Sequence, residues 1–438
     1  MKTIACYTLG CKVNQYDTQA MRELFEAAGY QSVDFHADAD VYLINTCTVT
    51  GTGDQKSLKL IRRIHREHPN SSIIVCGCLA QRDQQILMLE GVLLIVGVRQ
   101  RAQVVELYER AVCEGVRINA VPDERDWTFE YLSVNRHEGK TRAVMKIQEG
   151  CDRYCAYCII PSVRGPLRYM PIDGVKKQAI QLAAQRYKEI VVTGIHLASY
   201  GRGIEGVGHS ENESRPALID AIRAVHDTEG IARVRLGSLE PILITADFVG
   251  QIAELPKLCG QFHLSMQSGS GSVLKRMRRR YSPDEYYEAV VRLRTAFPDC
   301  AITTDVLTGF PGETDQEAQQ TYDFVGKVGF ARIHVFPYSR RVGTVANDME
   351  GQVPEQIKKQ RTAALIALGN QLEAAFVKNL VGKCVTVLME EAQGGGLVMG
   401  YSPQYVRVIS EGRPGEIADV LIDRTEGGTA YGHVRKDD

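Results

Sequence analysis

The chain has 438 residues, and its 52 Lys and Arg against 53 Asp and Glu give a formal net charge of −1. This length is too great for one ordinary hydrophobic core and predicts two to three domains. The near-neutral charge excludes a global positive field that would attract nucleic acid, so any RNA site must be a local basic patch.

No segment of the sequence is typical of a membrane or secreted protein. The longest apolar run, GVLLIVGV at 91–98, is shorter than the roughly 18 residues that a membrane span needs. Gly10 and Lys12 interrupt the apolar stretch near the N-terminus before it could form a secretory signal. We therefore expect a cytoplasmic protein without membrane association, whose 12 cysteines bind metal or act in catalysis rather than form disulfides.

Residues 1–112 alternate between short apolar runs and helical patterns. Strands are predicted at 3–9, 41–45 and 72–76, and helices at 15–29, 55–68 and 100–112. Alternation of this kind predicts a doubly wound α/β domain with a mostly parallel sheet. Residues 113–140 are polar and irregular, and they are expected to form a linker.

A second alternating series fills residues 141–372. Six strands are predicted there, at 142–148, 189–195, 232–239, 261–268, 301–310 and 332–339. That number is two short of a closed eight-stranded barrel, and it fits an open, partial (β/α)6 barrel. An amphipathic helix is expected at 354–380. Residues 373–438 are expected to form a third domain, in which short β runs with glycine turns predict a small β-barrel.

Three cysteines gather on the loop after the first strand of the second series. Cys151, Cys155 and Cys158 form a C-x-x-x-C-x-x-C pattern in CDRYCAYC. Three thiolates can hold three irons of a 4Fe–4S cube and leave the fourth iron open for another ligand. A zinc site normally takes four protein ligands, and this loop has no fourth Cys or His nearby.

Another trio of cysteines is scattered through the first domain. Cys11, Cys47 and Cys78 each follow the end of a predicted strand. Parallel strands joined by right-handed crossovers bring their carboxyl ends to one edge of the sheet, so the three thiols should converge. They are expected to hold a second cluster with an open iron. Cys76 is the alternative to Cys78, but only Cys78 lies in the loop beyond the glycine.

The first motif, in this position, resembles the radical S-adenosylmethionine (SAM) superfamily. The resemblance implies that SAM binds the open iron and is cleaved to a 5′-deoxyadenosyl radical. It also implies SAM contacts at an aromatic beside the last cysteine and at the carboxyl ends of the strands. The corresponding residues are Tyr157, Thr193, Gly194, Ser238, Glu240 and Gln267.

Over essentially the whole chain the arrangement resembles the methylthiotransferase family. TLGCKVNQYD, NTCTVT, GCLAQ, KIQEGCDRYCAYCIIPSVRG and HVFPYSRRVGT are most similar to the branch that acts on N6-threonylcarbamoyladenosine at tRNA position 37, next to the anticodon. The C-terminal module resembles the RNA-binding TRAM domain. The resemblance implies that the Cys11 trio holds an auxiliary cluster carrying sulfur, that one SAM methylates this sulfur, and that the radical from a second SAM removes hydrogen from C2 of the adenine. An aromatic C–H is not acidic enough for a side-chain base, which is why a radical is required.

The expected partners are the tRNA anticodon stem-loop and a low-potential electron donor resembling flavodoxin or ferredoxin, and the chain is expected to be a monomer. Basic residues would contact phosphates, and aromatic residues would stack on unpaired bases. The RNA-binding candidates are Lys275, Arg276, Arg278, Arg279, Arg280, Arg340, Arg341, Tyr401, Tyr405 and Arg407.

Other functions remain open at this point. The same family includes enzymes that act on isopentenyladenosine in tRNA or on a ribosomal protein. A more distant alternative is an RNA-binding protein with structural zinc on its cysteines.

Overall fold

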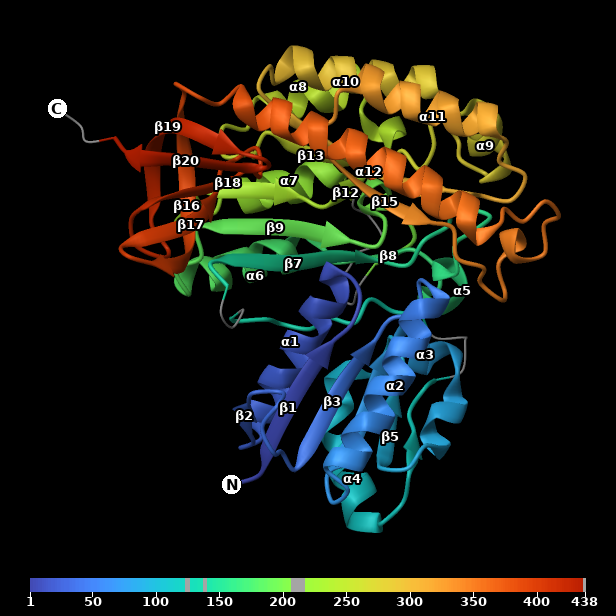
Figure 1. Cartoon of the computed structure of the whole chain (residues 1–438). Coiled ribbons are helices and arrows are strands. Elements are labelled where there is room, and N and C mark those ends of the chain that lie inside the picture. Colours follow the sequence, from blue (N-terminus) through green and yellow to red (C-terminus); the bar gives the residue numbers. More distant parts are fainter. Residues whose placement is uncertain (123–126, 137–139, 206–216, 436–438) are drawn as a thin grey trace, which may run out of the picture.

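The computed structural model describes residues 1–122, 127–136, 140–205 and 217–435. Figure 1 shows three parts: an N-terminal α/β domain, a central domain of parallel strands covered by helices, and a small C-terminal barrel against one end of the central domain. The expected fold class is confirmed in each part. Within the described residues, no helix is long and apolar enough to cross a bilayer.

The N-terminal domain is built on a six-stranded, all-parallel sheet with the order β2-β1-β3-β4-β5-β6. Helices α1 and α4 cover one face of this sheet, and α2 and α3 cover the other, as a doubly wound fold requires. The strands are β1 Thr3–Thr8, β2 Gln31–Val33, β3 Val41–Thr46, β4 Ser72–Gly77, β5 Val92–Val96 and β6 Ile118–Asn119. The helices are α1 Lys12–Ala27, α2 Gly51–Glu67, α3 Cys78–Arg82 and α4 Val104–Glu114.

The sequence predicted only three of these strands. Strand β5 occupies the apolar run at 91–98, which is too short for a membrane span but long enough for a buried strand. Strands β2 and β6 have only three and two residues and lie at the two edges of the sheet, so they give almost no periodic signal.

The central domain contains the six predicted parallel strands. They are β7 Arg142–Glu149, β9 Glu189–Gly194, β11 Arg233–Leu236 continued by β12 Ser238–Leu239, β13 Gln261–Leu264, β14 Ala301–Thr308 and β15 Arg332–Pro337. The hydrogen bonding is interrupted between β11 and β12, so that the strands form two sheets, β10-β8-β7-β9-β11 and β12-β13-β14-β15. The short strands β8 Arg168–Tyr169 and β10 Ile204–Glu205 extend the first sheet. This is an open partial barrel, as predicted.

Helices surround the barrel and bury its outer face in one large core. The five helices between strands are α6 Ile172–Ala184, α7 Leu218–His226, α8 Ala246–Ala253, α10 Pro283–Ala296 and α11 Asp315–Val328. Two short helices, α5 Ile160–Arg164 and α9 Gly271–Arg276, lie in loops at the carboxyl ends of the strands.

Helix α12, Glu355–Lys378, runs from the edge strand β15 to the C-terminal barrel, where Val377 and Leu380 enter the barrel core. The barrel is closed, with the order β16-β17-β18-β20-β19. Its strands are β16 Cys384–Gly394, β17 Leu397–Tyr401, β18 Arg407–Glu411, β19 Ile417–Glu426 and β20 Thr429–Val434. The last strand was not among the predicted β runs.

The N-terminal and central domains are joined by a buried apolar contact. Tyr16 and Ala20 of α1 pack against Val144 of β7 and Val191 of β9. Leu132, from the segment expected to be a linker, is buried in the same cluster and accepts a hydrogen bond from the Tyr16 hydroxyl. The part of this segment around Leu132 is therefore packed into the domain interface, whereas β6 lies at the edge of the N-terminal sheet.

Candidate active site

The loop after β7 brings the first cysteine trio together. Gly150 has φ +77°, and a Cβ added there would lie 1.8 Å from the Pro166 carbonyl oxygen, so the loop must turn tightly at this position. The Cys151 N–H donates to the Gly165 carbonyl at 3.2 Å, and the Cys158 N–H donates to the Cys155 carbonyl at 2.9 Å. Burial and the neighbouring thiols raise the pKa of Cys158 to about 12. The three thiols are thus close enough to influence one another.

Glu240 organises the charges around this loop. Its carboxylate lies 2.9 Å from Arg153 Nε, 3.0 Å from His196 Nε2 and 3.3 Å from Arg279 Nη1. Burial opposes ionisation of Glu240, but these three partners outweigh it and lower its pKa to about 2. Arg279 Nη1 also lies 3.4 Å from Cys155 Sγ. Glu240 therefore aims one guanidinium at a cysteine of the trio.

The second trio converges at the carboxyl edge of the N-terminal sheet. Cys11 precedes α1, Cys47 follows β3 directly, and Cys78 begins α3 after β4. Strands β1 and β3 are neighbours whose following helices cover opposite faces, so this edge is the switch point where ligands bind in doubly wound folds. Burial raises the pKa of Cys78 to about 11, and the thiols of Cys11 and Cys47 add to that rise.

Gly10 permits the close approach of two of these loops. It has φ +100°, and an added Cβ would lie 2.9 Å from the Cys47 Cβ and 3.0 Å from its Sγ. Cys76, the alternative to Cys78, is fully buried in β4 among the core residues on the α1 and α4 side of the sheet. Gly10 therefore brings the Cys11 loop against Cys47, and the core position of Cys76 leaves Cys78 as the thiol beyond the end of β4.

Each trio offers three thiols as possible ligands of a metal group. Among the described residues, no three His, Cys, Asp or Glu side chains are gathered closely enough to hold one metal ion. An iron–sulfur cube presents its irons at separate corners, so its three thiolates need not converge on one point. Three thiols at each site match a cube with one iron left for another ligand.

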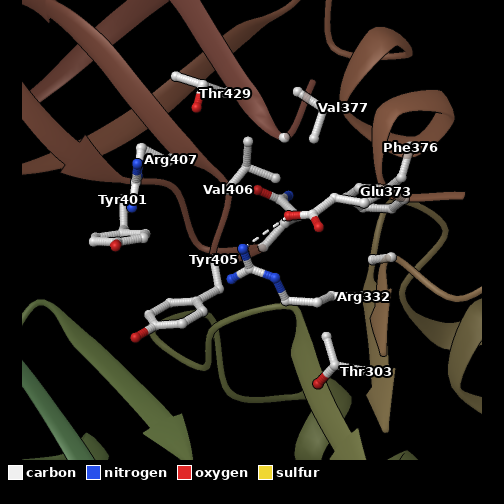
Figure 2. Close-up of a pocket in the computed structure, with 13 residues that line it drawn as sticks. Thr303, Arg332, Glu373, Phe376, Val377, Tyr401, Tyr405, Val406, Arg407 and Thr429 are labelled. Atoms are coloured by element: carbon white, nitrogen blue, oxygen red, sulfur yellow. Dashed lines mark ion pairs between the residues drawn. The ribbon is translucent and has the colours of Figure 1, made fainter. Parts of the chain in front are cut away.

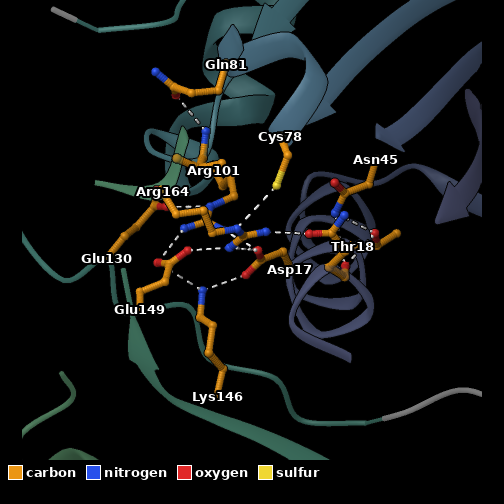
Figure 3. Close-up of polar contacts among 12 residues, drawn as sticks. Asp17, Thr18, Asn45, Cys78, Gln81, Arg101, Glu130, Lys146, Glu149 and Arg164 are labelled. Carbon is orange, nitrogen blue, oxygen red and sulfur yellow. Dashed lines mark hydrogen bonds and ion pairs between the residues drawn. The ribbon is translucent and has the colours of Figure 1, made fainter. Parts of the chain in front are cut away.

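The segment that follows Cys158 connects the two trios. Helix α5 begins two residues after Cys158, and Ile159 and Val163 pack against Cys78. Arg164, the last residue of α5, lies with its Nε 3.3 Å from Cys78 Sγ (Figure 3). Both trios therefore border one region at the domain interface.

Arg164 belongs to a buried ionic network between the two domains (Figure 3). Glu149, at the end of β7, accepts from Arg164 at 2.6 Å and from Arg101 at 3.1 Å. Asp17 of α1 pairs with Arg101 and accepts from Lys146 at 2.6 Å. The sequence analysis did not identify this network, because its members are scattered and show no motif.

A second connection lies in the loop after β15. Arg341 is buried there, pairs with Asp54 of α2 and donates to the hydroxyl of Thr48, next to Cys47. The Ala346 N–H donates to the Ala156 carbonyl at 2.7 Å, inside the loop of the first trio. This loop therefore touches both cysteine loops.

The residues expected to contact SAM all lie at the carboxyl end of the central barrel. Thr193 and Gly194 end β9, and an added Cβ on Gly194 would lie 2.8 Å from the Gln148 Cβ. The Tyr157 ring packs edge-on against Phe310, with centroids 6.5 Å apart. Ser238 and Glu240 flank the end of β12, and Gln267 follows β13 with φ +69°.

The basic run after α9 divides between surface and interior. Lys275, Arg278 and Arg280 are exposed, whereas Arg276 is held by Glu317 at 2.7 Å. The Arg279 side chain is 7% exposed and is occupied by Glu240 and Cys155. Its guanidinium therefore faces the interior of the protein and not the surface.

The remaining RNA candidates also divide. Arg340 is exposed, but Arg341 is buried against Asp54, so its guanidinium is not available to a phosphate. Arg407 is exposed on β18 and lines a cavity of about 220 Å³ between the C-terminal barrel and the central domain (Figure 2).

Tyr401 and Tyr405 lie at the edge of the same cavity, with their rings stacked and centroids 4.7 Å apart. The Arg142 guanidinium lies 4.8 Å and 4.9 Å from the two ring centroids. Both rings thus take part in the contact between the barrel and the central domain.

Comparison with known proteins identifies both cysteine-bearing domains. Residues 3–97 match the uncharacterized protein family UPF0004, and residues 145–325 match the radical SAM superfamily. Among solved structures, the chain resembles the radical S-adenosylmethionine methyltransferase TsrM from Kitasatospora setae. That match has a TM-score of 0.57 and 14% identity over 79% of this chain and 77% of the other, so it supports the fold alone.

Curated relatives match over nearly their full length. The threonylcarbamoyladenosine tRNA methylthiotransferase MtaB of Bacillus subtilis (strain 168) is 40% identical to this chain. The alignment covers 96% of this chain and 93% of that relative. A tRNA-2-methylthio-N(6)-dimethylallyladenosine synthase of Pelotomaculum thermopropionicum is 32% identical, with 96% and 94% covered. The chain is therefore an enzyme of the radical SAM methylthiotransferase family and belongs to its threonylcarbamoyladenosine tRNA methylthiotransferase branch.

Proposed function

We propose that this enzyme places a methylthio group on C2 of N6-threonylcarbamoyladenosine at position 37 of tRNA. The observation that carries the proposal is the meeting of two three-thiol sites at one domain interface, joined by α5. The choice of nucleoside is supported by the 40% identity to a relative named for that substrate.

In this proposal Cys151, Cys155 and Cys158 hold the radical SAM cluster, and Cys11, Cys47 and Cys78 hold the auxiliary cluster. When bound, the two clusters and SAM supply the radical and sulfur chemistry, and the protein supplies binding and orientation. Electrons come from a low-potential donor of the flavodoxin or ferredoxin type.

The chain's own residues hold this arrangement in place. Glu240 fixes Arg153 and Arg279 beside the first trio. Ion pairs of Arg341 with Asp54 and of Arg164 with Asp17 hold the N-terminal domain, which carries the second trio, against the central domain. Such rigidity matters because a misplacement of about 1 Å can reduce a rate roughly a hundredfold.

For the tRNA, we propose a surface formed by Lys275, Arg278, Arg280 and Arg340, all of which are exposed. The C-terminal barrel, with Arg407, would contact a more distant part of the RNA. Phosphate contacts of this kind carry affinity and make binding sensitive to salt.

A second candidate substrate is the dimethylallyl form of the same adenosine, because relatives named for it match nearly the full chain at 32–33% identity. The deciding experiment is mass spectrometry of tRNA nucleosides from cells with and without this gene. We expect only the 2-methylthio derivative of threonylcarbamoyladenosine to disappear. Loss of the dimethylallyl derivative instead would favour the second candidate, and no change in either would contradict both.

A further inference from the structure

Arg164 links the two proposed cluster sites through one side chain. It is 1% exposed and bonds in three directions, to Cys78 Sγ at 3.3 Å, to Glu149 at 2.6 Å and to the amide oxygen of Asn14. Cys78 and Asn14 belong to the N-terminal domain, whereas Arg164 and Glu149 belong to the central domain. Through Arg164, the central domain therefore contacts a cysteine of the N-terminal domain.

Among the described residues, cations outnumber carboxylates around Arg164. Four cations lie within 4 Å of Glu149, namely Arg101, Lys146, Arg164 and Arg168. Three carboxylates pair with these cations, namely Glu149, Asp17 and Glu130. Within the part of the chain that the structure describes, four positive charges therefore meet three negative charges.

An uncompensated buried charge is costly, so a further anion beside this network would be stabilising. Cys78 is the thiol that the network reaches, and its sulfur faces the Nε–H of Arg164. A thiolate at Cys78, as ligand of a cluster, would supply the missing negative charge. Hydrogen bonds to ligating sulfurs are among the factors that set the reduction potential of such clusters.

We propose that Arg164 is a positioning residue that holds the Cys78 sulfur toward the central domain and raises the reduction potential of the auxiliary cluster. This inference rests on the proposed function, because it requires a cluster on Cys11, Cys47 and Cys78. A cation close to a sulfur ligand favours the more negative, reduced state of the cluster. The central domain would in this way control the redox state of a group held by the N-terminal domain.

The test is an anaerobic redox titration monitored by electron paramagnetic resonance. It uses the full chain with Cys151, Cys155 and Cys158 replaced by Ala, so that only the auxiliary cluster contributes to the signal. In this background Arg164→Gln should lower the ratio of reduced to oxidised cluster at least tenfold at a fixed potential, which is about 59 mV for a one-electron couple. Arg164→Lys, which keeps the charge but cannot reach all three partners, should give a smaller shift in the same direction.

Arg101→Gln is the matched control. Arg101 is buried in the same network, and within the described residues its ion-pair partners are the carboxylates of Asp17, Glu130 and Glu149. This variant should shift the potential less than Arg164→Gln. Equal shifts in the two variants would overturn the contact between Arg164 and the sulfur as the cause.

If Arg164→Gln does not retain its cluster, the redox titration of Arg164→Lys tests the inference in its place. A wild-type potential and wild-type iron content in Arg164→Lys would overturn the inference. The proposed function fails in a different way, because the background protein would then hold no cluster even with Arg164 in place.

Discussion

Arg341, in the loop after β15, forms an ion pair with Asp54 in the first turn of α2, seven residues beyond Cys47. The pair joins the central domain to the N-terminal domain. The Arg341 side chain is 4% exposed, and it also donates to Thr48. This contact therefore fixes the segment around Cys47 against the loop after β15, and that loop bonds to the loop of the other trio through the Ala346 N–H and the Ala156 carbonyl.

Arg341→Met should destabilise the protein. The substitution removes one of two cations that pair with the Asp54 carboxylate. The other, Arg82, remains 3.0 Å away and compensates only part of the charge. We expect the free energy of unfolding to fall by about 2 kcal/mol, measured by circular dichroism during unfolding in urea. Arg340→Met is the control, because Arg340 is exposed and should change stability by less than about 0.5 kcal/mol. Similar losses in both variants would contradict this role for Arg341.

Gly10→Ala should prevent the auxiliary cluster from forming. The new Cβ would lie 2.9 Å from the Cys47 Cβ, so Cys47 would have to move, and alanine is strained at φ +100°. Iron analysis should show a fall from about eight irons per chain to about four. Gly29→Ala is matched in backbone strain, with φ +89° and no atom within 4 Å of the added Cβ. It should retain both clusters, and iron loss in the Gly29 variant as well would show that strain alone is responsible.

Cys47→Ala should abolish methylthiolation and leave SAM cleavage measurable, because the radical cluster is held by three other thiols. The assay measures 5′-deoxyadenosine together with the methylthio nucleoside in tRNA. Cys76→Ala is a suitable control, since Cys76 is buried in the sheet core two residues before Cys78. It should lose some stability but keep both activities. Loss of both activities in Cys47→Ala would argue against two independent sites.

Glu317→Gln should reduce the acid sensitivity of the protein. Hydrogen bonds from Arg276, assisted by Ser272 and the Thr314 N–H, lower the pKa of Glu317 to about 2 against the opposing effect of burial. A carboxyl whose pKa is lowered on folding stabilises the native state above its unfolded pKa of about 4.5, and this stabilisation is lost as the pH falls from 4.5 towards 2.

The contribution of Glu317 should be about 1 kcal/mol, because solvent partly screens the pair. Urea unfolding at pH 6 and pH 3 should therefore show a smaller difference in stability for Glu317→Gln than for the wild type. Glu288→Gln, in an exposed pair with Arg292, is the control and should leave the difference unchanged. An unaltered pH dependence in Glu317→Gln would contradict the assignment.

Alternation of strand and helix patterns predicted the central barrel strand by strand, because all of its main strands except the edge strand β15 are largely buried and helices separate them. The convergence of Cys11, Cys47 and Cys78 followed from their positions at strand ends. The contacts of Arg164 and Arg341 were not predictable in this way. Their partners lie 86 and 287 positions away in the sequence, and no periodic pattern links them.

The basic run near α9 illustrates the same limit. In the sequence, Arg278, Arg279 and Arg280 look equivalent. Arg278 adopts φ +60°, a left-handed turn, and it and Arg280 are exposed while the Arg279 side chain points inward to Glu240. The direction of each side chain depends on this backbone turn and on a carboxylate from a distant strand, neither of which local sequence reveals.

Helix α12 has 24 residues without interruption, which corresponds to a length of about 36 Å. Near one end, Lys358 donates to the Tyr338 carbonyl at 3.0 Å, close to the loop that contacts both cysteine sites, and at the other end Val377 is anchored in the barrel core. The length of the helix thus sets the distance between this loop and the C-terminal barrel. With the tRNA contact proposed above for the barrel, an RNA fragment too short to span that length would reach only one end of the helix, so truncating the stem should weaken binding while the modified base still fits.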